Sequence, residues 1–170
     1  MQAEVVVFAV GNRSRGDDAL GPLLLERLAS WLAAGVQAHE FELIEDYQLQ
    51  IEHALDLQGK RLALFIDAGC GTTAPLEFYA IAPARLPAVR STHELPPQGV
   101  LDAYRQIVQA EPPPSFVLCV RGEGFGLGQG LSGPAKAHME AAWRQLSLLC
   151  AKPDAASRRA LANNAEPGAA

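Results

Sequence analysis

Short apolar or alternating runs recur along this chain and are separated by longer stretches with apolar residues every three or four positions. The runs have the length and apolar content of strands, and they fall at residues 4–10, 36–44, 62–66, 76–81 and 115–120. Helical spacing occurs at residues 20–32, 48–57, 100–108 and 132–149. The alternation predicts an α/β fold, a single-domain three-layer sandwich whose twisted, mostly parallel sheet of about five strands has helices on both faces.

The length and composition fit one folded domain followed by a short tail. With 170 residues, of which 49% are hydrophobic, the chain is long enough to bury one core. We assign the domain to residues 1–150. Residues 151–170 are rich in Ala, Asn, Arg and Pro and lack periodicity, so we expect a largely disordered tail.

Charge and cysteine content exclude several classes of partner. The net charge is −5 and no basic stripe is present, which argues against nucleic acid. The first apolar run, about seven residues long, falls well short of the ~20 needed to span a bilayer, so we expect no membrane partner. Three separated cysteines, Cys70, Cys119 and Cys150, fit free thiols in a reducing compartment. Together these features predict a cytoplasmic protein, and we expect a monomer.

Polar residues that follow the predicted strands are the first candidates for a functional site. In an open parallel sheet, ligands bind beyond the carboxyl ends of the strands. Asp17, Asp18, Asp46, Asp67 and His93 all fall in such positions. Each has a structural alternative, since such aspartates commonly cap helices or turns and a lone histidine is often a surface residue. The other histidines, His39, His53 and His138, we interpret as structural.

Two carboxylates and one imidazole form a mixed oxygen and nitrogen set that suits a borderline divalent ion such as nickel or zinc. The paired acids at the start of the first helix argue against a nucleotide-binding protein, because negative charge there repels phosphate. A glycine-rich segment, residues 121–130, also lacks the layout of a dinucleotide fingerprint. It is either a flexible connection or a surface that a partner chain approaches closely.

Four short blocks along the chain share the order and spacing of a known family. They are Val10-Gly11-Asn12 followed after four residues by Asp17-Asp18-Ala19-Leu20-Gly21, then Leu64-Phe65-Ile66-Asp67-Ala68-Gly69, Ser91-Thr92-His93, and Gly126-Leu127 through Gly130-Leu131-Ser132. Over roughly residues 4–150, this arrangement resembles that of the nickel-iron hydrogenase maturation endopeptidases.

The resemblance implies an endopeptidase that removes the C-terminal extension of a nickel-loaded hydrogenase large-subunit precursor. Asp18, Asp67 and His93 match the family's nickel-binding and catalytic positions, and the nickel would arrive with the substrate and serve as the recognition element. Other divalent ions could replace it in the isolated protein. The catalytic base stays open, with Asp17 as one candidate. The alternative is a noncatalytic, nickel-dependent chaperone or scaffold for the same subunit.

One block departs from the family pattern. Many members have Asp-Gly-Gly-Thr after the second strand, whereas this chain reads Asp46-Tyr47-Gln48-Leu49. The acid is kept, but two bulky side chains replace the glycines. The change indicates selectivity for a particular hydrogenase rather than a different reaction.

Overall fold

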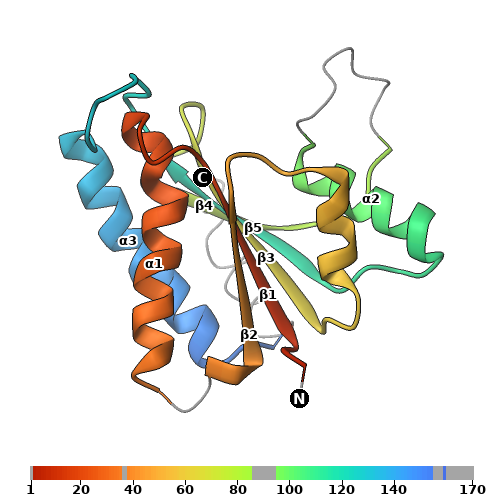
Figure 1. The fold of residues 1–170 in the computed structure, drawn as a ribbon. Coiled ribbons are helices and arrows are strands. Elements are labelled where there is room, and N and C mark those ends of the chain that lie inside the picture. The colour runs from red at the N-terminus through yellow and green to blue at the C-terminus, as the bar shows by residue number, and fades with distance from the viewer. Residues whose placement is uncertain (1, 36–37, 86–94, 155–158, 160–170) are drawn as a thin grey trace, which may run out of the picture.

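Five strands form one sheet in the computed structural model, which describes residues 2–35, 38–85, 95–154 and 159 (Figure 1). Their order across the sheet is β2-β1-β3-β5-β4, with β4 antiparallel to β5 and the other neighbours parallel. The predicted mostly parallel sheet is therefore confirmed. The strands are β1 (Val5–Val10), β2 (Phe41–Asp46), β3 (Leu62–Gly69), β4 (Leu76–Ile81) and β5 (Ser115–Arg121).

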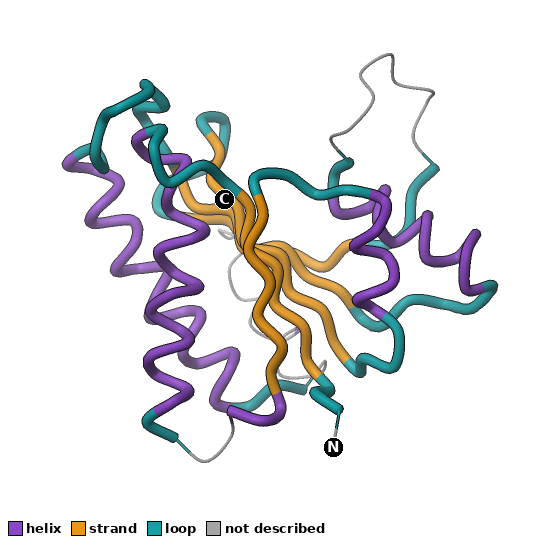
Figure 2. Tube along the Cα trace, viewed as in Figure 1, coloured by secondary structure: helices purple, strands orange, loops and turns teal. Residues whose placement is uncertain are grey.

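Helices cover both faces of the sheet, which confirms the three-layer arrangement (Figures 1 and 2). The helices α1 (Leu20–Ala33) and α3 (Gly133–Ala151) pack on one face, and α2 (Pro97–Val108) packs with the 3-10 helix η3 (Ile51–Leu57) on the other. Strand alternation directs Val5 and Val7 toward α1 and α3. The intervening Val6 and Phe8 point to the opposite core beside α2 and η3.

Several element boundaries differ from the sequence prediction. The segment at 51–57 is a 3-10 helix, and β2 begins at Phe41 after a short 3-10 turn, η2 (Ala38–Glu40), that contains His39. Strand β3 was expected to stop before Asp67 but continues to Gly69. Its pairing with β5 extends as far as Gly69 opposite Arg121, so Asp67 lies within a strand and not beyond its end. Strand length here depends on the neighbouring strand, which local sequence does not specify.

Helix α1 approaches the ends of the central strands closely because position 21 has no side chain. A Cβ built on Gly21 would lie 2.7 Å from Val10 O and 3.1 Å from Ile66 O. Gly21→Ala is therefore expected to lower the free energy of unfolding by about 2 kcal/mol, as overpacked sites do. The matched control is Gly133→Ala, where a Cβ meets nothing within 4 Å, and it should change stability by less than about 0.5 kcal/mol. Urea unfolding measures both, and equal effects would contradict this packing argument.

Neither a disulfide nor a membrane span occurs in the part of the chain that the structure describes. Cys70, Cys119 and Cys150 are not joined in disulfides among the described residues. No helix among the described residues is both long and apolar enough to cross a bilayer. The predicted disordered tail lies largely outside the described residues and stays a prediction.

Candidate active site

The carboxyl ends of the four parallel strands lie together at the top of the sheet in Figure 1. We call this end of the sheet the carboxyl edge, or simply the edge, because the strands terminate there. Three of the predicted acids come to this edge from separate parts of the sequence. Asp18 lies in η1 (Gly16–Ala19), a 3-10 turn that contacts β3 and leads into α1. Asp46 is the last residue of β2, and Asp67 lies near the end of β3.

Asp17 is a buried structural anchor. Its carboxylate is 0% exposed and accepts four hydrogen bonds, from the backbone N–H groups of Glu123, Gly124 and Ser132 and from the Ser132 hydroxyl, at 2.7–2.9 Å. Burial alone would raise the pKa of Asp17, but these bonds outweigh it and hold the pKa below its usual value. Since Asp17 is out of reach of a substrate, we exclude it as the catalytic base that the sequence left open.

The adjacent Asp18 is placed differently. Its side chain is partly exposed, and its Oδ2 accepts one hydrogen bond, 2.8 Å long, from the backbone N–H of Asn12. Among the described residues, no other hydrogen bond to this carboxylate occurs. The Gly11-Asn12 turn therefore orients Asp18 while leaving it partly exposed, so that one of the paired acids anchors the fold and the other stays accessible.

Asp67 on β3 has Cys119 on β5 as its neighbour across the sheet. The two residues are far apart in the sequence, so sequence alone did not connect them. In the register of β3 and β5, Asp67 lies opposite Cys119, and adjacent strands place such partners on the same face. Cys119 Sγ is 3.0 Å from the Thr72 hydroxyl. Burial raises the pKa of the Cys119 thiol, the Thr72 hydrogen bond opposes this shift, and the Asp67 charge adds to it. The raised pKa keeps this thiol protonated at neutral pH, where it is a weak nucleophile.

Asp46 also has a partner that sequence spacing did not reveal. His53, which is 8% exposed, accepts a 2.9 Å hydrogen bond at Nδ1 from the backbone N–H of Gln50. Its Nε2 lies 3.4 Å from Asp46 Oδ2, and its ring meets Phe8 edge-on. His53 therefore links the start of η3 to the end of β2 and orients the Asp46 side chain.

The glycine-rich loop after β5 is held in place by the loop that precedes α1. Besides the bonds to Asp17, Gly16 N–H donates to Gln129 O at 3.1 Å and Gly128 N–H donates to Ser14 O at 2.7 Å. Gly16 has φ +56°, and a Cβ there would collide with Gly124 O. These contacts favour an ordered loop over the flexible connection that was one of the two interpretations from sequence.

The same arrangement of strands and helices occurs in solved hydrogenase maturation proteases. HycI from Thermococcus kodakarensis KOD1 superposes with a TM-score of 0.62 at 22% identity, over 87% of this chain and 92% of that one. HybD from E. coli gives 0.66 at 23% identity, over 88% and 92%. A hydrogenase 3 maturation protease gives 0.58 at 21% identity, over 84% and 88%. This chain has the maturation-protease fold. No protein-family model and no curated protein matches the sequence.

Within the maturation-protease fold, the third predicted site residue cannot be placed, because His93 lies outside the described residues. Leu95, the first described residue after position 85, donates its N–H to Leu49 O at 3.0 Å in the loop that follows Asp46. Among the described residues, no group of three or more His, Cys, Asp and Glu side chains is arranged to hold a metal. Asp18 and Asp67 could supply carboxylate oxygens to a divalent ion, and a borderline ion such as nickel would also need nitrogen or sulfur ligands.

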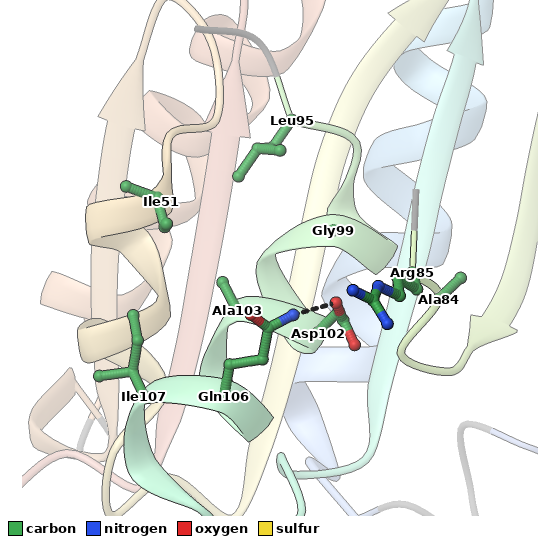
Figure 3. Close-up of a pocket in the computed structure, with 9 residues that line it drawn as sticks. All are labelled: Ile51, Ala84, Arg85, Leu95, Gly99, Asp102, Ala103, Gln106 and Ile107. Carbon is green, nitrogen blue, oxygen red and sulfur yellow. Dashed lines mark hydrogen bonds between the residues drawn. The ribbon is translucent and has the colours of Figure 1, made fainter. Parts of the chain in front are cut away.

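A separate groove lies between η3 and α2 and is mainly apolar (Figure 3). Its volume is about 290 Å³, and Asp102 accepts a 2.6 Å hydrogen bond from Gln106 at its polar end. The lining residues are Ile51, Ala84, Arg85, Leu95, Gly99, Asp102, Ala103, Gln106 and Ile107. None of the predicted acids lines this groove, so it is distinct from the candidate active site.

Proposed function

We propose that this chain is a cytoplasmic endopeptidase that removes the C-terminal extension of a nickel-loaded nickel-iron hydrogenase large-subunit precursor. The observation that carries the proposal is the placement of Asp18 and Asp67. Two carboxylates from different segments reach one edge of a maturation-protease fold, where open α/β sheets bind their ligands. Solved proteins with this fold include hydrogenase maturation proteases and endopeptidases.

In this proposal the nickel ion belongs to the substrate. Asp18, Asp67 and His93 would bind it together with ligands from the precursor, a mixed donor set that suits nickel. Binding would hold one peptide bond of the precursor beside the edge of the sheet, and such positioning is a large contribution to catalysis. Because a precursor without nickel lacks this attachment, the same three residues would also make cleavage depend on metal insertion.

The decisive experiment compares nickel-loaded and nickel-free precursor incubated with the purified chain. Mass spectrometry of the precursor then shows whether its C-terminal extension has been removed. Loss of the extension only from the nickel-loaded form is the expected result. Binding of the nickel-loaded precursor without any loss of mass would instead favour a noncatalytic chaperone.

Removal of residues 152–170 is expected to leave cleavage within about twofold of wild type. The last helix ends at Ala151, and one contact of the tail is a 2.9 Å hydrogen bond from exposed Arg61 to Pro153 O. Exposed contacts of this kind contribute little to stability. Initial rates and melting temperatures of the two forms measure the effect. A large loss of either would show that the tail supports the domain or the substrate.

A further inference from the structure

Two large apolar side chains are exposed on loops at the candidate active-site edge. Tyr47, directly after β2, is 74% exposed, and Leu127, in the glycine-rich loop after β5, is 78% exposed. Single exposed apolar residues are common on protein surfaces and need no explanation by themselves. Tyr47 and Leu127 differ from such scattered residues in two ways. Both lie on loops at the same end of the sheet as Asp18 and Asp67, and hydrogen bonds hold the backbone of those loops in place.

Hydrogen bonds join three loops into a continuous rim, which we define as residues 12–16, 45–48 and 122–131. Arg13 links the first loop to the end of β2 through two hydrogen bonds to Glu45, at 2.7 and 2.8 Å. The first loop also bonds to the glycine-rich loop through Ser14 and Gly16. Tyr47 N–H is bonded at 2.6 Å to Asp46 Oδ1. The rim therefore presents Tyr47 and Leu127 from ordered backbone.

The position of the rim determines the kind of partner that it fits. A metal ion carried by a folded protein reaches Asp18 and Asp67 only if the surface around that metal lies against the surrounding loops. Exposed aromatic and aliphatic side chains on ordered backbone are suited to such a surface, because little conformational freedom is lost on binding.

We propose that Tyr47 and Leu127 are the apolar anchors by which this chain binds the folded large-subunit precursor around its metal site. This inference rests on the proposed function and adds a specificity determinant to it. Tyr47 projects from the loop that directly follows β2 and is 74% exposed, so its side chain can add a contact that distinguishes one precursor from another. The anchors contribute to binding of the protein substrate and take no part in bond cleavage.

The test uses the full chain and the nickel-loaded precursor with three variants, Tyr47→Ala, Leu127→Ala and the control Leu148→Ala. Leu148 is also exposed, at 61%. It lies near the end of α3, which runs from the carboxyl ends of the strands toward their amino ends, away from the candidate active site (Figure 1). Two quantities are measured for each variant, the Kd for the precursor by calorimetry and the kcat and KM for cleavage. Each anchor variant is expected to raise Kd and KM at least about fivefold with kcat within about twofold, whereas Leu148→Ala matches wild type.

The two measurements separate this inference from the proposed function. If wild type cleaves and both anchor variants bind as wild type does, the anchor assignment is wrong and the proposed function stands. If wild type binds but does not cleave, and the anchor variants weaken binding, the anchors stand and the protease assignment fails. An equal loss of affinity in the Leu148→Ala control would also overturn the anchor assignment.

Discussion

Asp67→Asn is expected to abolish processing of the nickel-loaded precursor, with the rate of cleavage falling more than about 100-fold. Replacing even a supporting partner of a metal ligand commonly costs 10- to 100-fold, so loss of a direct anionic ligand should cost at least as much. Asparagine keeps the shape of the side chain, and Asp67 is only partly buried near the end of β3, so the fold should be retained. Quantitative mass spectrometry of the precursor measures the rate.

The same result is expected for Asp18→Ala, Asp67→Ala and His93→Ala, although His93 lies outside the described residues. The control is Glu140→Gln, an acid-to-amide change on α3, where Glu140 forms a surface ion pair with Arg27. That variant should cleave at the wild-type rate. Full cleavage by the Asp18 and Asp67 variants, with unchanged melting temperatures, would refute the assignment of these acids to the site.

Asp17→Asn is expected to cause the largest loss of stability among acid-to-amide changes at this edge, about 3 kcal/mol in the free energy of unfolding. The amide places N–H donors against a pocket that already supplies four donors to the carboxylate, and buried unpaired groups cost about 1–3 kcal/mol each. The neighbouring Asp18→Asn is the matched control. It disturbs one hydrogen bond of a partly exposed carboxylate and should cost about 1 kcal/mol or less.

The pH dependence of unfolding provides an independent check on Asp17. Its pKa is lower in the folded protein than in the unfolded chain, so the unfolded state takes up the proton first as the pH falls. The stability that Asp17 contributes is therefore present above about pH 4 and is lost as the pH falls through the folded-state pKa. The difference in unfolding free energy between wild type and Asp17→Asn should narrow below about pH 4. A difference that stays constant in acid would mean that the charge of Asp17 is not what stabilises the loop.

Much of the architecture could be predicted because it follows from local pattern. Runs of apolar residues, helical spacing and the glycines near Asp18 indicated the alternating elements, and all five strands occur where an apolar run was found. The general rule that ligands bind beyond the carboxyl ends of parallel strands then selected Asp17, Asp18, Asp46 and Asp67 from 19 acidic residues, and the family resemblance narrowed these to Asp18 and Asp67. That selection needed the strand positions but not the strand order.

Roles that depend on neighbours from distant segments could not be predicted. Asp17 and Asp18 are adjacent and chemically identical in the sequence, yet one is a buried anchor and the other stays accessible. The difference arises because the glycine-rich loop, more than a hundred residues later, supplies the donors that enclose Asp17. The extension of β3 past Asp67 likewise depends on the length of β5.

The sequence by itself therefore determined the class of fold, the edge at which chemistry is expected and the acids that reach it, since these depend on periodicity and on chain order. Only the tertiary structure decided which acid is an anchor, which histidine orients Asp46 and which exposed side chains share a rim with the site. Those properties depend on the order of the strands and on hydrogen bonds between loops far apart in the chain. Local composition does not encode such contacts, because each requires a partner that folding alone brings near.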